Sequence, residues 1–294
     1  MHTKSAFPNR VVPYLLILPQ LVVVVIFFLW PALRVLIESF NRVGAFGLHG
    51  RFVGFENFVA AVTSGTYVND IEVTVLYSAI VTVASMGIGL LIAVLVEGVR
   101  RGRAVYRTLF AWTYAVPAAV AGALWLFMFN PEEGVASRIL GHMGVPWNFY
   151  VNAFDGMSLI IALTVWQQVA YNFLFYTAGL QAVPAQLIEA ATLDGAGPVR
   201  RFWRITFPLV SSTSFYLLVL NIVFVFFSTF AIIDIVTQGG PHNATTTLVY
   251  QIYLDAFQNS NTSIAAAETV LLIAIVALLT VIQFRYLNRR VHYQ

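Results

Sequence analysis

The sequence predicts an all-α integral membrane protein with six transmembrane helices and both termini in the cytoplasm. Composition, the spacing of charge-free runs and the distribution of lysine and arginine predict this fold. Of the 294 residues, 59% are hydrophobic and only 10% are charged, against about 25% charged in an ordinary soluble domain. The mean hydropathy is +0.80, so too few charges remain to solvate a water-soluble protein of this size. Lipid is therefore the solvent for most of the chain.

Charge-free runs divide the chain into spans. A helix needs about 20 apolar residues to cross the roughly 30 Å hydrocarbon core, because each residue advances it by about 1.5 Å. Six runs of this kind occur, one of them interrupted only by Glu268, and Trp30-Pro31 is expected to close the first. We treat residues 1–294 as a single transmembrane domain with spans at about 11–36, 72–97, 108–130, 157–183, 208–235 and 263–286.

Lysine and arginine are sorted by loop. Twelve of the 16 basic residues fall into four groups: Lys4 and Arg10; Arg100, Arg101, Arg103 and Arg107; Arg200, Arg201 and Arg204; Arg285, Arg289 and Arg290. These groups belong to the N-terminus, the loop between spans 2 and 3, the loop between spans 4 and 5, and the C-terminus. Because cytoplasmic loops collect Lys and Arg, these four segments are expected to face the cytoplasm. The same sorting argues against a nucleic-acid surface as the reason for the net charge of +3.

Enzyme patterns are missing from the sequence. The chain has no cysteine and five histidines, all in predicted loops or tails. It contains no His-Glu-x-x-His zinc pattern, no Gly-x-Ser-x-Gly nucleophile pattern and no glycine-rich phosphate loop. We therefore expect no catalytic residue, no metal site and no cofactor bound by this chain.

Polar side chains within the spans are candidates for a solute pathway, because burying them in lipid is costly. Spans 4 and 5 are the best supplied, and the candidates are Gln167, Gln168, Asn172, Asn221 and Asp234. Such groups also bond neighbouring helices, and a carboxylate near the outer end of a span, such as Asp234 or Glu268, can reach water. Both interpretations remain open at this point.

The loop at residues 184–208 predicts two short helices. Pro184 suits a first helical position, and Gly195 suits the left-handed position just past the end of a helix. Pro198 can open a second helix that ends at Pro208 and carries three arginines with Trp203. The pair, joined by Gly195-Ala196-Gly197, would form a rigid projection on the cytoplasmic face. An amphipathic connector lying on anionic lipid fits the same residues.

The outer segment before span 6 predicts one more helix. It begins Gln238-Gly239-Gly240-Pro241, and Tyr250, Tyr253 and Phe257 then recur at helical spacing. A short helix is therefore expected over about 248–257.

Several motifs resemble one known family. The run Glu189-Ala190-Ala191-x-x-Asp194-Gly195-Ala196, followed by Phe202, Ile205 and Pro208, resembles the EAA loop of binding-protein-dependent ABC transporter permeases. Features of the carbohydrate-uptake branch are Trp30-Pro31, Asn57-Phe58, and Gly239-Gly240-Pro241 followed by Thr245-Thr246-Thr247. The resemblance extends over nearly the whole chain.

The resemblance implies a type I ABC importer permease in a bacterial inner membrane. The loop would be a coupling helix seated on a cytoplasmic ATP-binding subunit, present in two copies, and ATP would be bound there. A second, similar permease and an extracytoplasmic substrate-binding protein would complete the importer. Carried over by position, the coupling residues are Glu189, Ala190, Ala191, Asp194, Gly195 and Ala196.

The solute is the least determined part of this expectation. The loop at 238–250 and the tail Gln283-Phe284-Arg285-Tyr286 are most similar to permeases of glycerol-3-phosphate uptake systems. This implies sn-glycerol-3-phosphate or a glycerophosphodiester, although Arg34, near the outer end of span 1, is the only cation available within the spans. A neutral sugar or oligosaccharide is the alternative solute. Two other classes stay open, an autonomous secondary transporter and a membrane transferase using Asp194.

Overall fold

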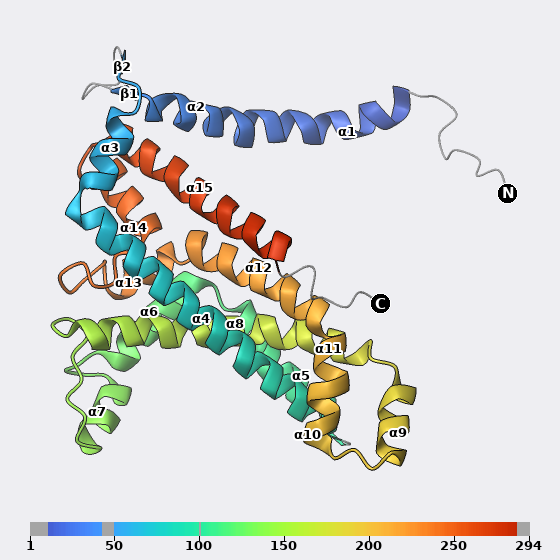
Figure 1. Ribbon diagram of the computed structural model, residues 1–294. Coiled ribbons are helices and arrows are strands. Elements are labelled where there is room, and N and C mark those ends of the chain that lie inside the picture. The colour runs from blue at the N-terminus through green and yellow to red at the C-terminus, as the bar shows by residue number, and fades with distance from the viewer. Residues whose placement is uncertain (1–10, 43–49, 100, 287–294) are drawn as a thin grey trace. The chain divides into compact units, whose positions relative to one another are not determined.

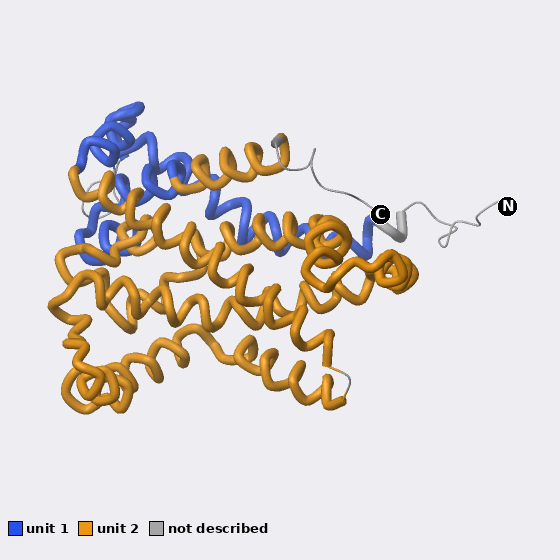
Figure 2. The backbone as a smooth tube through the Cα atoms, turned by 60° about the horizontal axis from the view of Figure 1, so that its bottom comes forward, with its two compact units in different colours: residues 1–64, 252–271 blue, residues 65–251, 272–294 orange. Residues whose placement is uncertain are grey.

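The computed structural model describes residues 11–42, 50–99 and 101–286, and most of these residues are helical. The chain divides into two units, residues 1–64 with 252–271 and residues 65–251 with 272–294 (Figure 2). Five basic residues used to predict the orientation lie outside the described residues: Lys4, Arg10, Arg100, Arg289 and Arg290.

Unit 1 begins with one long apolar helix made of three segments, α1 (Val11–Val24), the π-helical turn η1 (Val25–Leu29) and α2 (Trp30–Ser39). The prediction that Trp30-Pro31 closes this helix is wrong, because the helix continues to Ser39. The Trp30 amide bonds to the Val25 carbonyl, five residues back. This wider turn makes room for Pro31, which lacks an amide and whose ring would clash with the carbonyl four residues earlier.

A two-stranded hairpin follows in unit 1. Strand β1 (Asn41–Arg42) pairs antiparallel with β2 (Arg51–Phe52), and α3 (Glu56–Thr63) comes next. Asn57 is buried, and its Nδ2 donates to the carbonyls of Ser39 (2.9 Å) and Asn41 (3.0 Å). The Asn57-Phe58 motif therefore anchors the end of the first span to the hairpin.

Unit 2 is organised around α8 (Ala153–Gln181). This helix packs along α4 (Gly65–Gly98) and also contacts α5 (Arg103–Ala111), α6 (Ala118–Phe129), α12 (Ser211–Phe227) and α13 (Phe230–Val236) (Figure 1). Asn152 caps its start, since the Asn152 side chain accepts from the Phe154 amide at 2.9 Å. With 34 residues, α4 is about 51 Å long and exceeds the hydrocarbon thickness.

Helix α4 begins at Gly65, earlier than the predicted start of span 2 near residue 72. Its extra turns hold the loop that precedes α14 (Leu248–Tyr253). Thr74 Oγ1 accepts from the Leu248 amide at 2.9 Å, and Asn69 Nδ2 donates to the Asn243 carbonyl at 3.4 Å.

The loop between α13 and α14 is tightly built. It contains a cis Gly240–Pro241 bond, and Gly239 has a φ of +79°. A Cβ at Gly239 would lie 2.5 Å from Thr246 Oγ1, so only glycine fits there. Thr245 Oγ1 donates to the Gly240 carbonyl at 2.8 Å, and Thr246 Oγ1 donates to the Gly239 carbonyl at 3.2 Å. The glycines and threonines of this motif are thus explained by local geometry.

The predicted third span is bent in its middle. Helix α5 continues through the 3₁₀ turn η2 (Trp112–Ala115), and α6 then leaves at 96°. Val116 is extended, with φ −81° and ψ 119°, as expected for a residue that precedes a proline. Pro117 is therefore the cause of the bend, which the prediction of one straight span at 108–130 did not include.

The predicted fifth span is interrupted at both ends. The chain runs through α10 (Pro198–Arg201), the π-helical turn η3 (Phe202–Thr206) and α11 (Phe207–Leu209), then bends by 65° into α12. A second break at Ser228 and Thr229 separates α12 from α13. The expected helix end at Pro208 is wrong by one residue, because the π-helical turn again precedes the proline and lets the helix pass it.

Helices α7 (Val135–His142), α14 and α15 (Thr262–Tyr286) complete the described chain. Helix α7 follows α6, and the predicted helix near 248–257 is present as α14 and the π-helical turn η4 (Leu254–Gln258). Helix α15 is the last span. Among the described residues, four helices are long and apolar enough to cross a membrane, or up to six if each bent pair is one span. Within unit 2, α7 and α9 (Ala185–Leu193) lie at opposite ends (Figure 1), as the predicted alternation of loops requires.

Gly89 allows α4 and α8 to approach closely. A Cβ on Gly89 would lie 2.7 Å from Asn172 Cβ, whereas a Cβ on Gly87 would meet nothing within 4 Å. We expect Gly89→Ala to lower the free energy of unfolding by about 1–3 kcal/mol, as overpacking does. Gly87→Ala, its matched control, should be neutral or stabilise the helix by up to about 1 kcal/mol. Unfolding in detergent with increasing denaturing surfactant measures both, and equal effects would contradict this role for Gly89.

Candidate functional site

The loop after α8 forms two helices that are fastened to each other. Pro184 was predicted to be the first residue of a helix, but it is the N-cap of α9, with φ −61° and ψ 125°. The helix therefore begins one residue later, at Ala185. Gly195 has a φ of +74°; its amide bonds to the Thr192 carbonyl (3.1 Å), and the Ala196 amide bonds to the Ala191 carbonyl (2.9 Å). These two bonds form a Schellman motif, which requires a left-handed residue where Gly195 stands.

A side-chain contact joins the two helices of the loop. The Arg201 guanidinium, at the end of α10, donates to Thr192 Oγ1 on α9. Aromatic rings of Phe202, Trp203 and Phe207 pack in sequence along the second helix, with neighbouring centroids 5.1 Å and 5.2 Å apart. The loop is therefore a rigid projection, not a flexible connector.

The six predicted coupling residues are together in this projection but differ in exposure. Glu189, Ala190, Asp194 and Gly195 are exposed, Ala196 is half-buried, and Ala191 is buried. Ala191 therefore shapes the loop from inside and is not available to a partner's surface.

Leu193 was missed by the sequence analysis. Its side chain is 90% exposed at the end of α9, and Val199 is 70% exposed at the start of α10. Leu193 directly precedes Asp194 in the chain. An apolar residue inside a loop rich in charged residues was the signal that could have identified Leu193. The exposure of its side chain depends on how the loop folds, which the sequence does not show.

A buried polar layer joins α4, α8 and α12 in the middle of unit 2. Asn221 Nδ2 donates to Asn172 Oδ1 at 2.8 Å, and Asn172 Nδ2 donates to Asn221 Oδ1 at 3.1 Å. Gln168 Nε2 donates to the same Asn221 oxygen at 3.3 Å, and Asn172 Nδ2 also reaches Ser85 Oγ at 3.2 Å. Three of the five predicted pathway residues thus bond one another.

The other two predicted pathway residues lie apart from this layer. Gln167 Nε2 donates to the Val116 carbonyl at 3.1 Å, at the bend of the third span. Asp234, on α13, accepts from the Tyr250 hydroxyl at 3.4 Å. Both residues therefore bind a segment next to an interrupted span.

A cavity of about 320 Å³ lies beside the polar layer. Its lining comes from η2, α8, α12 and the break after α12: Tyr114, Gln168, Tyr171, Leu220, Val223, Phe224 and Ser228. Gln168 alone belongs to both the layer and the cavity. The tyrosines were not predicted, although a hydroxyl within a span was the signal that could have identified them.

Comparison with known proteins decides the family. Residues 85–293 match the family described as "Binding-protein-dependent transport system inner membrane component". The chain belongs to this family. It is a membrane-embedded transport permease and not an enzyme, and the predicted resemblance to ABC transporter permeases is confirmed.

Two relatives match this permease along nearly its whole length. The sn-glycerol-3-phosphate transport system permease protein UgpA of Rhizobium meliloti (strain 1021) is 50% identical over 290 residues, covering 99% of both chains. The protein of the same name from Salmonella typhi is 47% identical over 292 residues, again covering 99% of both chains.

The fold is similar to that of a solved transporter. A bacterial ABC transporter involved in the import of the acidic polysaccharide alginate gives a TM-score of 0.80 at 21% identity, covering 94% of this permease and 96% of that chain. A bacterial alginate ABC transporter in complex with an alginate pentasaccharide-bound periplasmic protein gives a TM-score of 0.82 at 20% identity, covering 95% of this permease and 94% of that chain. The predicted all-α membrane fold is confirmed by this likeness.

The Asn172–Asn221 pair should couple α8 to α12 energetically. Asn221→Ala removes the acceptor of Gln168 and one of the acceptors of Asn172 in a buried layer, so we expect a loss of about 1–3 kcal/mol in the free energy of unfolding. Asn172→Ala should cost a similar amount, and the double variant should cost clearly less than the sum. Surfactant unfolding of the three variants measures this cycle. Simple additivity would argue that the two amides do not interact.

Gly195 should be required for its left-handed backbone. Gly195→Ala forces an ordinary residue into that region at a cost of about 1–2 kcal/mol. Local opening of the loop should therefore increase by about fivefold or more, measured as faster hydrogen exchange of the Ala196 amide. Gly197, with φ −65° and open space where a Cβ would stand, provides the control. Gly197→Ala should leave the exchange rate unchanged, and equal acceleration in both would exclude the explanation.

Proposed function

We propose that this chain is one of two permease subunits of an ATP-driven importer that carries sn-glycerol-3-phosphate, or a related glycerophosphodiester, into the cytoplasm. The observation that carries the proposal is the match of 47–50% identity, over 99% of the chain, to permeases of sn-glycerol-3-phosphate transport systems. The chain crosses a bacterial inner membrane several times, with both termini in the cytoplasm. A substrate-binding protein delivers the solute from the other side.

The projection of α9 and α10 is the element that docks on the ATP-binding subunit. Its exposed carboxylates, Glu189 and Asp194, can accept charge-assisted hydrogen bonds, and Leu193 can enter an apolar pocket of the partner. ATP binds to two copies of that partner and not to this chain. Because the projection is rigid, it transmits a displacement that a flexible loop would absorb.

The solute passes beside the cavity at the interrupted spans. Irregular backbone is tolerated within a membrane where it lines a cavity or is buried in protein, and broken helices mark the binding sites of many transporters. The bend at Val116 and the break at Ser228 both lie next to this cavity, whose polar groups are Gln168, Tyr114, Tyr171 and Ser228. A solute hydroxyl would find hydrogen-bond partners here.

The charge of the cavity affects the choice of solute. None of its lining residues is basic, so we assign the cation that balances a phosphate to the second permease. A cavity of aromatic and amide side chains also suits an uncharged sugar. A neutral sugar or oligosaccharide is therefore the second candidate.

Purification from the native membrane tests the assembly. A tagged chain extracted in mild detergent should bring down an ATP-binding subunit and a second six-span permease. In proteoliposomes, binding protein loaded with sn-glycerol-3-phosphate should then stimulate ATP hydrolysis and solute uptake. Stimulation only by a loaded sugar-binding protein would transfer the proposal to the second candidate. Recovery of the chain alone, with uptake driven by an ion gradient, would refute the importer.

Glu189→Lys should abolish stimulated hydrolysis and uptake while the chain still inserts. The substitution places a cation where a carboxylate meets the partner, and like charges across an interface are strongly unfavourable. Glu133→Lys makes the same exchange at an exposed residue of the turn between α6 and α7 and should leave both activities unchanged. Normal stimulation in Glu189→Lys would remove Glu189 from the docking surface.

A further inference from the structure

We propose that Glu97 is a positioning residue that makes the loop-side ends of α4, α5 and α8 move as one body when the projection is displaced. The proposal rests on the importer function above and adds a residue outside the EAA loop. Glu97 is the penultimate residue of α4. It faces two arginines of α5 and the final residue of α8.

The Glu97 carboxylate receives donors from two other helices. Arg103 Nη1 lies 3.1 Å from Oε2, and Arg107 Nη2 donates to Oε1. Gln181 Nε2 donates to the same Oε1 at 3.2 Å. The Glu97 side chain is only 18% exposed, so solvent screens these contacts less than it would screen a surface pair. One carboxylate therefore ties three helix ends together.

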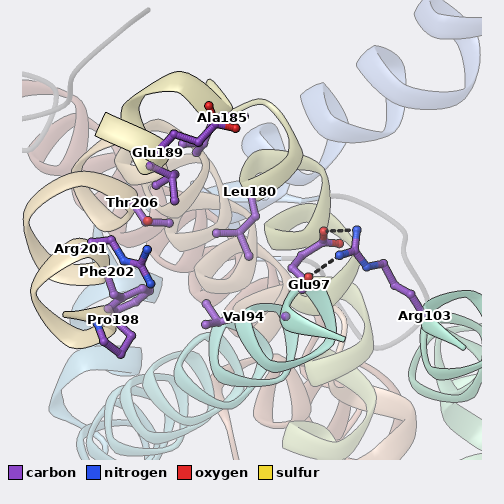
Figure 3. Close-up of a pocket in the computed structure, with 13 residues that line it drawn as sticks. Val94, Glu97, Arg103, Leu180, Ala185, Glu189, Pro198, Arg201, Phe202 and Thr206 are labelled. Carbon is purple, nitrogen blue, oxygen red and sulfur yellow. Dashed lines mark hydrogen bonds and ion pairs between the residues drawn. The ribbon is translucent and has the colours of Figure 1, made fainter. Parts of the chain in front are cut away.

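A cleft separates the projection from the helix ends behind it. It measures about 720 Å³ and is lined by Val94 and Glu97 on α4, Leu180 on α8, Ile188 and Glu189 on α9, and Phe202 on η3. Figure 3 shows the Glu97–Arg103 pair on the opposite side of the cleft from Glu189 and Arg201. The loop therefore does not fill the space against α4, and force cannot pass straight across it.

The loop is joined to the bundle at two places, through the end of α8 and through η3 and α11 into α12. On the α8 side only residues 182–184 separate Gln181 from α9, so a displacement of the projection reaches Gln181 directly. The hydrogen bond from Gln181 transmits the displacement to Glu97. The ion pairs of Glu97 then transmit it to Arg103 and Arg107, at the start of the bent third span.

Helix α5 also packs directly on α8, where the rings of Phe110 and Phe173 have centroids 5.7 Å apart. Without Glu97, the loop-side end of α5 would therefore follow α8 less closely.

The arginines could instead use Glu97 merely for charge balance. A residue with that role would affect assembly or stability, but it would not change how the helix ends move between states. A distance measurement within the working complex separates the two roles. The chain has no cysteine, so two introduced cysteines are its only labelling sites.

The experiment places spin labels at Ala104→Cys on α5 and Ala182→Cys just after α8, both exposed positions. The importer is assembled in lipid with its partners and measured without nucleotide and with ATP trapped. In the parent chain the distance should be narrow and equal in both states. In Glu97→Gln it should broaden and differ between the states. Solute transported per ATP should fall about fivefold or more, the lower range of coupling between two sites.

Gln181→Met is the second variant, because it removes the link to α8 and keeps both ion pairs of Glu97. It should show the same broadening, so the proposal remains testable if Glu97→Gln fails to assemble. Glu133→Gln, at an exposed carboxylate, should change neither the distance nor the ratio. A narrow, unchanged distance in Glu97→Gln or Gln181→Met, with transport intact, would overturn the proposal. A parent complex without an ATP-binding partner would instead refute the proposed function.

Discussion

The reciprocal amide pair between Asn172 and Asn221 is the interaction on which the arrangement of unit 2 depends. In lipid the hydrophobic effect does not hold one apolar helix against another, so close packing and hydrogen bonds must do so. Asn172 contributes to close packing and to hydrogen bonding. Its Cβ lies against Gly89 of α4, where a larger residue would clash. Its side-chain amide forms hydrogen bonds with Asn221 of α12. Sliding α8 by one turn would leave the amides of this layer unpaired in a medium without water. The layer therefore sets the register of three helices, and Gln168 connects it to the cavity.

The same need to satisfy polar groups explains the interrupted spans. Pro117 forces Val116 out of the helix, and the Val116 carbonyl loses its helical partner. Gln167, beside the polar layer on α8, donates to that carbonyl. The chain passes Pro31 and Pro208 differently, because in each case a π-helical turn ends two residues before the proline and the preceding amide bonds five residues back. These three prolines therefore have two different effects. Pro31 and Pro208 are accommodated by a π-helical turn, and Pro117 makes a bend beside a cavity.

Features governed by local chemistry could be predicted from the sequence. Apolar runs located the long helices, and Pro184, Gly195 and Pro198 located the two helices of the loop within about one residue. Features governed by distant contacts could not be predicted. Nothing near Asn172 in the sequence indicates that it pairs with a residue 49 positions away, so the choice between packing and solute pathway stayed open. Pro117 did signal its bend, but the apolar composition of 108–130 concealed it. The exposure of Leu193 and the burial of Ala191 follow from the Schellman turn. The turn could be predicted from Gly195, but which side of α9 it would leave exposed could not.

The cleft separates two parts of unit 2, each held together by its own contacts. The projection is stiffened by the Schellman bonds and by Arg201 on Thr192, while the cleft leaves it room to move relative to α4. The helix ends behind the cleft are bound together by one carboxylate, and the polar layer lies further along the same helices. Helix α8 carries both the Gln181 contact and the polar layer, and Gln168 of that layer lines the cavity. In the proposed importer, a displacement entering at α9 would be transmitted along α8 to Asn172 and Gln168. Helix α8 would then be the physical connection between the proposed docking loop and the proposed solute pathway.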